Sequence, residues 1–483
     1  MVAFKNSQTA MPGSRDEGKT GSNILLCYTC QLLNPQNELP TKRILQTWWP
    51  LAASWLLMGA ELPAITAVIA RLPNPVINLA AYGGVVFPLA LIIEAPIIML
   101  LAASTALCKD TASYNKVRRF MMVAGASLTL LHILIAFTPL YYVVVKGILG
   151  VPDVVVEPAR IGLMIMTPWT WSIAYRRFNQ GVLIRFNRSQ TVGIGTVIRL
   201  STDGLVLLAG YLIGTIPGII VATSAVAAGV VSEAIYAGIA ARPVINSDLR
   251  LTSPVKPELT WPAFFTFYIP LAMTSLLILL ANPIGSAALS RMPDPLASLA
   301  AWPVVTGLVS MFRSAGTAFN EVVVALLDEP YSSHSLRRFA TWLEGLSTLA
   351  LLVIVATPLA PFYFQTISAL SDNLAGMARV GTWLALPLPA LSVLQSWYQG
   401  AILHGRRTGG IIEAVVVYLV ASAVTLAAGV VWGQATGLYI GLASLSISTL
   451  MQTIWLWVRS QPVFNEIHQR DALEIEPATS VAV

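Results

Sequence analysis

The sequence predicts an all-α integral membrane protein, in which twelve transmembrane helices form two parallel six-helix repeats. The first observation is composition: 56% of the 483 residues are hydrophobic and only 11% are charged, against roughly a quarter charged in an ordinary soluble domain. The second is that the apolar residues gather in runs long enough to cross about 30 Å of hydrocarbon as helices. The third is an internal repeat whose two copies lie about 220 residues apart.

The predicted spans follow one another along the chain, and each is an apolar run that ends at a polar or a glycine- and proline-containing turn. They lie near residues 45–70, 77–107, 120–145, 160–184, 190–214, 218–241, 262–289, 296–326, 338–364, 380–403, 411–433 and 436–458. Pro63 and Pro283 fall inside spans and are expected to kink them, which neighbouring helices tolerate in a membrane.

Polar segments divide the chain into five parts. We expect a cytoplasmic N-terminal tail at 1–43, a first lobe at 44–242, a cytoplasmic linker at 243–261, a second lobe at 262–460 and a cytoplasmic C-terminal tail at 461–483. The first 22 residues are polar, so no cleavable signal peptide is expected.

The two lobes repeat one sequence pattern. At an offset of 220, residues 48–85 and 268–305 share fourteen identities, and the agreement continues at an offset of 219. The matches that apolar composition does not explain include Pro50/Pro270, Pro63/Pro283, Arg71/Arg291, Pro73/Pro293, Pro75/Pro295, Arg118/Arg337, Pro168/Pro387, Gln180/Gln399 and Glu233/Gln452. Because six helices return the chain to its starting side, the repeats are parallel, and substrate sites are expected between halves that rock against each other.

The distribution of basic residues predicts the orientation. With the N-terminus inside, sixteen Lys and Arg residues fall in cytoplasmic loops and helix ends, and five fall on the other side. This bias places both termini in the cytoplasm and the protein in the cell (inner) membrane as a multi-pass protein. It also explains the net charge of +6 without a nucleic-acid partner.

Two motifs in the N-terminal tail are not taken as sites. Residues 13–20 match the phosphate-binding pattern G-x-x-x-x-G-K-[ST], but they lack the preceding buried strand and following helix that aim backbone amides at phosphate. The CYTC sequence at 27–30 has no second pair or histidine cluster to complete a metal site. We therefore expect no metal, no cofactor and no enzymatic activity, and an energy source other than a built-in ATPase.

Charged residues inside the spans are the candidate site, because each costs roughly 2.5–3.5 kcal/mol at the centre of a helix on insertion scales. Counting residues from the helix starts places Glu61 in the outer half, and Glu94, Arg176, Arg177, Glu233 and Arg313 in the cytoplasmic half. Arg199 and Asp203 lie four residues apart and are expected to pair. These charges fit either structural ion pairs or a cavity that such pairs close in one state.

Two residues carry the sharpest hypotheses. Arg313 replaces Ile93 in the repeat and is expected opposite Glu94, or as a ligand for an anionic substrate. Glu61, which aligns with Ala281 in the second repeat, is a candidate coupling-ion site together with Glu94. Alternatively, Glu61 forms a hydrogen bond with a backbone group that the kink at Pro63 leaves unpaired. The remaining candidates for substrate binding or gating are Arg176, Arg177, Gln180, Arg199, Asp203, Glu233, Asn282 and Gln399.

The sequence resembles the MOP flippase superfamily, which includes the multidrug and toxic compound extrusion (MATE) transporters. The resemblance rests on WWPL at 48–51 with its echo YIPL at 268–271, and on RRFNQGVLIRFNRSQ at 176–190 with its echo SWYQGAILHGRRTGG at 396–410. GAE at 59–61 and WPLA at 49–52 are most similar to the progressive ankylosis branch, which implies export of small anions such as citrate, nucleotides or pyrophosphate. Resemblance to the drug extruders implies cation-coupled antiport with a first-helix carboxylate, here Glu61, where those proteins typically have an aspartate.

Together these features predict a MATE-like secondary active transporter that exports small organic molecules from the cytoplasm by alternating access. The intramembrane arginines favour an anionic substrate. A proton- or sodium-coupled multidrug or cation antiporter is one alternative, and a lipid-linked sugar flippase is the other. The expected partners are the lipid bilayer and a small-molecule substrate, with the monomer as the functional unit.

Overall fold

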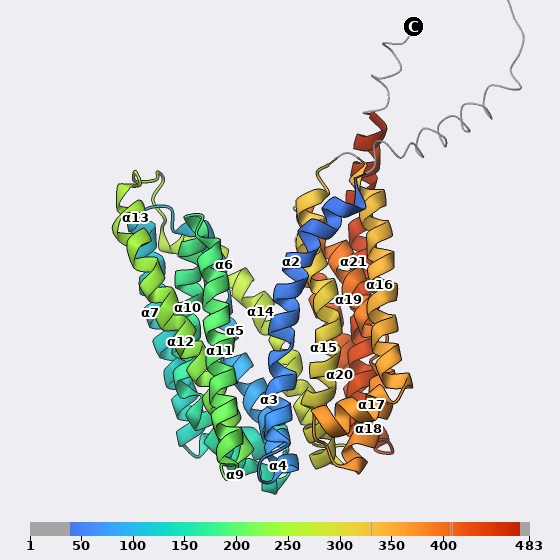
Figure 1. Cartoon of the computed structure of the whole chain (residues 1–483). Coiled ribbons are helices and arrows are strands. Elements are labelled where there is room, and N and C mark those ends of the chain that lie inside the picture. The colour runs from blue at the N-terminus through green and yellow to red at the C-terminus, as the bar shows by residue number, and fades with distance from the viewer. Residues whose placement is uncertain (1–38, 330, 406, 408, 474–483) are drawn as a thin grey trace, which may run out of the picture.

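The computed structural model describes residues 39–329, 331–405, 407 and 409–473. Most of the predicted N-terminal tail, with residues 13–20 and the CYTC sequence, lies outside the described residues. Within them the chain is helical and contains no β-strand (Figure 1).

The first half of the chain builds its six spans from several shorter helices. Three of these spans consist of two or more helical segments that follow one another end to end. Its elements are α2 (Thr41–Gly59), α3 (Glu61–Ile69), α4 (Pro75–Ala81), the π-helical segment η1 (Tyr82–Val86), α5 (Phe87–Ile98), α6 (Leu100–Leu107), α7 (Thr111–Phe137), α8 (Leu140–Tyr142), the π-helical segment η2 (Val143–Leu149), α9 (Asp153–Ile165), α10 (Thr167–Arg185), α11 (Ser189–Ile213), α12 (Gly218–Asn246) and α13 (Asp248–Leu251).

The second half repeats this order with more continuous helices. Its elements are α14 (Trp261–Leu289), α15 (Pro295–Leu326), α16 (Ser332–Ala356), α17 (Leu359–Pro361), the π-helical segment η3 (Phe362–Ile367), α18 (Asp372–Leu384), α19 (Leu388–His404), α20 (Gly409–Trp432) and α21 (Gly437–Leu473). Because α21 continues to Leu473, the first part of the predicted C-terminal tail is helical.

Eleven helical stretches of the described chain are long and apolar enough to cross a membrane. The twelfth position in the repeat is taken by α9 and α10, whose sequence is too polar to qualify. Arg176, Asn179 and Gln180 of α10 are nevertheless buried, because this helix lies inside its lobe and not against lipid. The predicted all-α membrane fold with twelve helical spans is confirmed.

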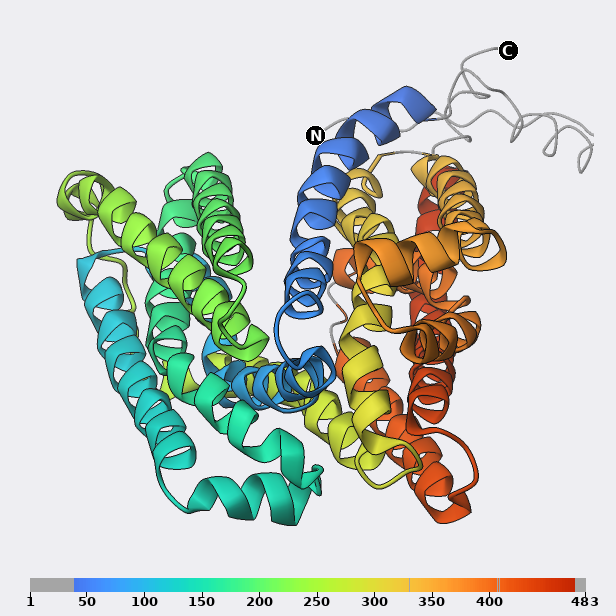
Figure 2. The same ribbon diagram turned by 60° about the horizontal axis from the view of Figure 1, so that its bottom comes forward.

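The two lobes form a V that is open on the side where α2 begins and α21 ends, and the lobes converge on the opposite side (Figures 1 and 2). The first helix of each repeat crosses over. α2 packs on α15, where Trp48 Nε1 donates to the Ala315 carbonyl at 3.0 Å, and α14 packs on α5, where the Tyr268 hydroxyl donates to the Pro96 carbonyl at 2.5 Å. The division into lobes at 44–242 and 262–460 stays a prediction about the repeat, and packing links the lobes through these two helices.

The duplicated loop between the first two spans of each repeat clasps the lobes together at their convergent side. Arg71 donates to the carbonyls of Thr366 and Ile367 at 2.5 and 2.7 Å, at the end of η3 in the other lobe. Arg291 donates to the carbonyls of Ile148 and Leu149 at 2.6 and 3.0 Å, at the end of η2. Carbonyls at a helix C-terminus lack intrahelical donors, so an arginine from the opposite lobe satisfies them.

The segment η1 explains why the repeat changes its offset from 220 to 219. Pro75 and Pro295 both begin their helices at offset 220, whereas Leu107 and Leu326 end the corresponding spans at offset 219. The first repeat therefore holds one extra residue inside this span, and a π-helical turn accommodates one extra residue without ending a helix. In the described chain the second repeat has no such turn within α15.

Two glycine contacts confirm the offset of 219 beyond η1. A Cβ added at Gly181 would lie 1.8 Å from Ser104 Oγ and 2.3 Å from the Leu101 carbonyl oxygen. A Cβ added at Gly400 would lie 2.7 Å from the side chain of Val323 and 3.3 Å from the Asn320 carbonyl oxygen, and these two residues are 219 positions beyond Ser104 and Leu101. Each lobe thus uses one glycine for the same close helix approach.

The linker is anchored to the start of α7 by Asp110. Its carboxylate accepts hydrogen bonds from the backbone N–H of Ser113 at 2.8 Å and of Val255 at 2.9 Å. Burial raises the pKa of Asp110, but the hydrogen bonds donated by Ser113 and Val255 outweigh it and hold this pKa below its usual value.

We predict that Gly181→Ala lowers the stability of the protein by about 1–3 kcal/mol, because the added methyl group overlaps a backbone carbonyl that has no room to move. The measurement is the thermal unfolding midpoint of the purified protein in detergent. Gly204→Ala on α11 is the matched control, because a Cβ there meets no atom within 4 Å. An equal midpoint for the two variants would contradict the close approach at Gly181.

Candidate functional site

Most of the predicted charged residues of the first repeat form one cluster. They come from α3 (Glu61), α10 (Arg176, Arg177 and Gln180), α11 (Arg199 and Asp203) and α12 (Glu233). On α10, positions 176 and 180 lie one turn apart and face α12, which places two donors opposite one carboxylate.

Glu233 is the centre of the cluster and is 1% exposed. Its carboxylate forms an ion pair with Arg176 and accepts a hydrogen bond from Gln180 Nε2 at 2.8 Å. Arg199 Nε lies 3.5 Å from Glu233 Oε2, and Arg199 Nη2 lies 2.9 Å from Glu61 Oε2. A carboxylate buried this completely is stable only when its lone pairs are satisfied. Here Arg176 and Gln180 of α10 donate hydrogen bonds to it, and Arg199 of α11 adds a second positive charge nearby.

The predicted pair between Arg199 and Asp203 is wrong. Arg199 extends away from its own helix to Glu61 and Glu233, and both Asp203 carboxylate oxygens are buried without a hydrogen-bond partner among the described residues. Asp203 packs against Gly229 of α12, where an added Cβ would lie 1.7 Å from its Oδ1. A spacing of four residues brings two side chains to one helix face. It does not make them a pair when the arginine also reaches carboxylates on other helices, here Glu61 and Glu233.

The predicted separation of Glu61 from the cytoplasmic charges is also wrong. Glu61 and Glu233 bind the same guanidinium, that of Arg199. Counting residues from a helix start assumes a straight, upright helix, whereas the first span is broken at Ala60, immediately before Glu61. The described residues show no hydrogen bond from Glu61 to backbone freed by Pro63.

A cavity of about 230 Å³ opens beside the cluster. Glu61, Glu94, Arg176, Arg177 and Arg199 line it together with apolar side chains such as Leu91 and Trp169. Within the described chain neither Glu94 nor Arg177 forms an ion pair within 4 Å, and Glu94 Oε2 and Arg177 Nε are buried without a partner. These two groups line the cavity without an ion-pair partner, so they are free to bind a ligand or an ion there.

The change of offset at η1 corrects the position of Arg313 in the repeat. Beyond η1 the offset is 219, so Arg313 corresponds to Glu94 and not to Ile93. The two residues do not face each other either. Glu94 lines the first-lobe cavity, and Arg313 lines three cavities on the second lobe and at its contact with α2.

The second lobe replaces the ion pairs of the first lobe with uncharged pairs. Gln395 and Gln452 occupy the positions of Arg176 and Glu233, and Gln395 Nε2 donates to Gln452 Oε1 at 2.8 Å. Tyr418 stands at the position of Arg199, and Ser422 at that of Asp203. The same helix contact is thus made by one hydrogen bond between neutral groups.

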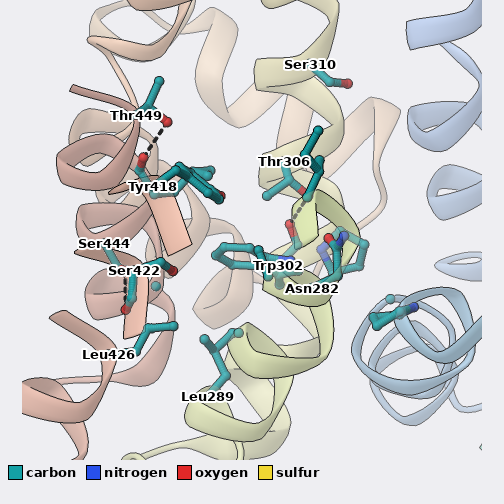
Figure 3. A pocket seen from close by; sticks show the side chains of 18 of the residues that line it. Asn282, Leu289, Trp302, Thr306, Ser310, Tyr418, Ser422, Leu426, Ser444 and Thr449 are labelled. Atoms are coloured by element: carbon teal, nitrogen blue, oxygen red, sulfur yellow. Dashed lines mark hydrogen bonds between the residues drawn. The ribbon is translucent and has the colours of Figure 1, made fainter. Parts of the chain in front are cut away.

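A cavity of about 470 Å³ lies in the second lobe between α14 and α15 on one side and α20 and α21 on the other. Leu62, Gly83, Phe87 and Pro88 of the first lobe line part of it as well. Figure 3 shows Asn282 and Trp302 facing Tyr418 and Ser422 across it. Of the predicted residues, Asn282 and Arg313 line this cavity, and Gln399 lines an adjoining cavity of about 250 Å³ that also contains Arg313.

The lining residues that sequence reasoning missed include Gln395, Tyr418, Ser422 and Gln452, which stand at the positions of charged residues of the first repeat. The match of Glu233 with Gln452 was visible in the repeat, and the same offset applied to each charged residue would have found the others. Their uncharged side chains gave no signal on their own, because single hydroxyl and amide groups are common in membrane helices.

No family model matches the sequence, and no curated protein matches it in sequence. Solved structures do match in fold. One is described as the inward-facing conformation of a multidrug resistance MATE family transporter of the MOP superfamily, with a TM-score of 0.63, 14% identity and coverage of 84% of this chain and 96% of that one. Another is the lipid II flippase MurJ in an inward closed conformation, with a TM-score of 0.61, 13% identity and coverage of 90% and 93%.

A third match is a MOP superfamily transporter from Pyrococcus furiosus, described by a reverse polarity of its binding pocket that suggests a different function. Its TM-score is 0.55 at 15% identity, with coverage of 87% of this chain and 96% of that one. The chain therefore has the fold of MATE and MurJ transporters, and the predicted MATE-like architecture is confirmed.

We predict that Glu233→Gln or Arg176→Gln alone destabilises the protein by about 3–5 kcal/mol, because each leaves a buried charge without its partner. The double variant Arg176→Gln/Glu233→Gln installs the pair found at Gln395 and Gln452 and should recover much of that loss. The measurement is the unfolding midpoint of all three variants in detergent. A double variant no more stable than the worse single variant would show that the two repeats do not share this contact.

Proposed function

We propose that the protein is a secondary active transporter that exports small organic anions from the cytoplasm by alternating access. The observation that carries this proposal is the arrangement of its two lobes. They are splayed on the side of the described chain ends and clasped by Arg71 and Arg291 on the other, with cavities inside and between them. A fold that is open on one side and latched on the other is one of the two states that alternating access requires.

The open side is assigned to the cytoplasm. The excess of Lys and Arg on this side supports the assignment. The likeness to a structure described as inward-facing supports it as well. In this assignment the structure represents the state that takes up substrate, and both chain ends are cytoplasmic in the cell membrane.

The coupling ion is assigned to the first-lobe cluster, with Glu61 and Glu94 as its candidate carboxyl groups. The cluster with its cavity holds four carboxyl groups, from Glu61, Glu94, Asp203 and Glu233, against three arginines. A bound proton or Na⁺ would balance this count in a medium that disfavours net charge. Asp203, which has no hydrogen-bond partner, joins the two candidates.

The interruption of the first span at Ala60 lies where ion binding could be coupled to movement of the lobes. α2 packs on α15 of the second lobe, and α3 contacts α15 as well as α11 and α12 of the first lobe. Glu61 is the first residue after the break, and its bond to Arg199 ties α3 to α11. Neutralising Glu61 would loosen this bond at the joint between the lobes. Arg176, Gln180, Arg199 and Glu233 then act as the scaffold or gate of the cluster, and Arg177 as a free charge at its cavity.

Two other substrate classes have an observation in their favour. The fold is shared with a multidrug resistance transporter, and the carboxyl groups of Glu94 and Asp203 would suit a cationic substrate. It is shared with a lipid II flippase as well, and arginines would suit the phosphates of a lipid-linked sugar. The closer resemblance to the progressive ankylosis branch, and the monomer as the functional unit, stay predictions.

The test is transport by the purified protein in liposomes, with citrate compared with ethidium under an imposed pH gradient. Transport of citrate but not ethidium would support the anion exporter. Transport of ethidium alone would assign the carboxyl groups to a cation antiporter, and transport of neither in well-sealed liposomes would overturn both assignments.

We predict that Glu61→Gln abolishes the response of transport to a pH gradient while the fold is retained, because an amide of the same shape does not exchange a proton. Transport rates with and without the gradient measure the effect. Glu413→Gln is the matched control, since Glu413 pairs with Arg459 at an exposed helix end. Proton-driven transport at the wild-type rate in Glu61→Gln would remove Glu61 from the coupling site.

We predict that Arg71→Ala/Arg291→Ala increases the population that is open at the clasped side, because four hydrogen bonds between the lobes are lost. A shift of about 1.4 kcal/mol is enough to change the ratio of the two states tenfold. Distances between spin labels at Gly147→Cys in η2 and Asn373→Cys in α18, in a background without native cysteines, report the separation.

Arg160→Ala is the matched control for the clasp variant. Arg160 lies in α9 and also donates to backbone carbonyls, at Ala136 and Phe137, but within its own lobe. Its removal should leave the distance distribution unchanged. A clasp variant with the same distribution as the control would show that Arg71 and Arg291 do not hold the lobes together.

A further inference from the structure

The 470 Å³ cavity of the second lobe occupies the place that the ion-pair cluster fills in the first lobe. Five of the residues that line it are the repeat equivalents of charged residues of the first lobe, at an offset of 219. The equivalent pairs are Glu94 and Arg313, Arg176 and Gln395, Arg199 and Tyr418, Asp203 and Ser422, and Glu233 and Gln452.

The difference in side chains explains why there is a cavity at all. In the first lobe Arg199 reaches across the space to Glu61 and Glu233 and occupies it. In the second lobe Ala281 stands at the position of Glu61, and Ala281 and Tyr418 both line the open cavity. A volume of about 470 Å³ is within the range of pockets that enclose drug-sized organic molecules.

The cavity has one charged group. Arg313 is the only charged residue among the described residues that line it. Its guanidinium forms no ion pair within the described chain, and its Nε is buried without an acceptor. The nearest acidic residue along its own helix face is Glu321, which is exposed and lies eight residues away, about 12 Å along the axis. A half-buried guanidinium that faces a cavity without a counter-charge favours the entry of an anion.

The rest of the lining fits an organic body. Trp302 and Leu289 supply apolar surface on one wall, and Leu426 lies on the other wall with the hydroxyl-bearing residues Ser422, Ser444 and Thr449 (Figure 3). Aromatic and aliphatic surface with a few polar groups orients a ligand without requiring a second charge.

We propose that this cavity is a binding site for an amphipathic organic monoanion, whose carboxylate, sulfonate or phosphoryl group binds Arg313 and whose apolar body lies against Trp302. This inference rests on the proposed function, in that the bound anion is the exported substrate. The two repeats then divide the work: the first lobe keeps a nearly self-compensated charge cluster, and the second keeps one free positive charge in an open pocket.

The test uses a matched pair of probes, 2-naphthoate and its neutral analogue 2-naphthamide. Isothermal titration of the purified full chain in detergent, with empty micelles as the blank, gives the two affinities. We expect the wild type to bind 2-naphthoate at least tenfold more tightly than 2-naphthamide. Equal affinities for the two probes would overturn the proposal.

Variants locate the site. Arg313→Gln should weaken 2-naphthoate at least tenfold and leave 2-naphthamide unchanged, and Arg313→Lys should restore part of the difference. Ser422→Asp keeps Arg313 and places the carboxylate of the first lobe in the cavity, so it should also weaken 2-naphthoate; this variant decides the matter if Arg313→Gln fails to fold. Arg338→Gln, which removes an exposed guanidinium from α16, is the matched control and should have no effect. Arg177→Gln tests whether the anion binds in the first-lobe cavity instead.

The outcomes separate this site from the transporter assignment. Loss of 2-naphthoate binding in Arg177→Gln, with Arg313→Gln unchanged, would overturn the site. If the Arg313→Gln variant still transports organic anions in liposomes with the affinity of the wild type, the proposed site is overturned and the proposed function stands. Binding that depends on Arg313 in a protein that transports no organic anion would support the site and remove the transporter assignment.

Discussion

The carboxylate of Glu233 is the point on which the first lobe depends. It is 1% exposed, it accepts hydrogen bonds from Arg176 and Gln180, and it forms a second ion pair with Arg199. Charges in a membrane interior need partners inside the protein, so this requirement draws α10, α11 and α12 together. It also places the most polar span of the protein away from lipid, and through Arg199 it holds α3 and Glu61 to the lobe.

Duplication met the same requirement in two ways. The first repeat kept charged groups that neutralise one another, whereas the second kept the contact as a hydrogen bond between Gln395 and Gln452. Shorter uncharged side chains in the second repeat leave space beside Arg313. The π-helical turn η1 holds one extra residue in the first repeat, and this residue determines which side chains of the two repeats correspond.

The two lobes are joined by elements that belong to both. α2 packs on the second lobe and α14 on the first, so movement of one lobe carries a helix that starts the other repeat. The duplicated loop arginines, Arg71 and Arg291, cap helix ends in the opposite lobe. Both features occur in each repeat, and they join the two lobes of the V-shaped structure at its convergent side.

The sequence by itself determined the membrane class, the helical spans, the repeat and the residue types of the site. Composition, run length and aligned prolines do not depend on how helices pack. Only the tertiary structure decided the partners: Arg199 binds Glu61 and Glu233 and not Asp203, and Arg313 corresponds to Glu94 because η1 absorbs one residue. A long side chain selects its partner from every helix within reach, and a one-residue insertion inside a helix changes which side chains correspond without a visible gap. Both outcomes depend on distances between segments far apart in the chain, which local sequence patterns do not contain.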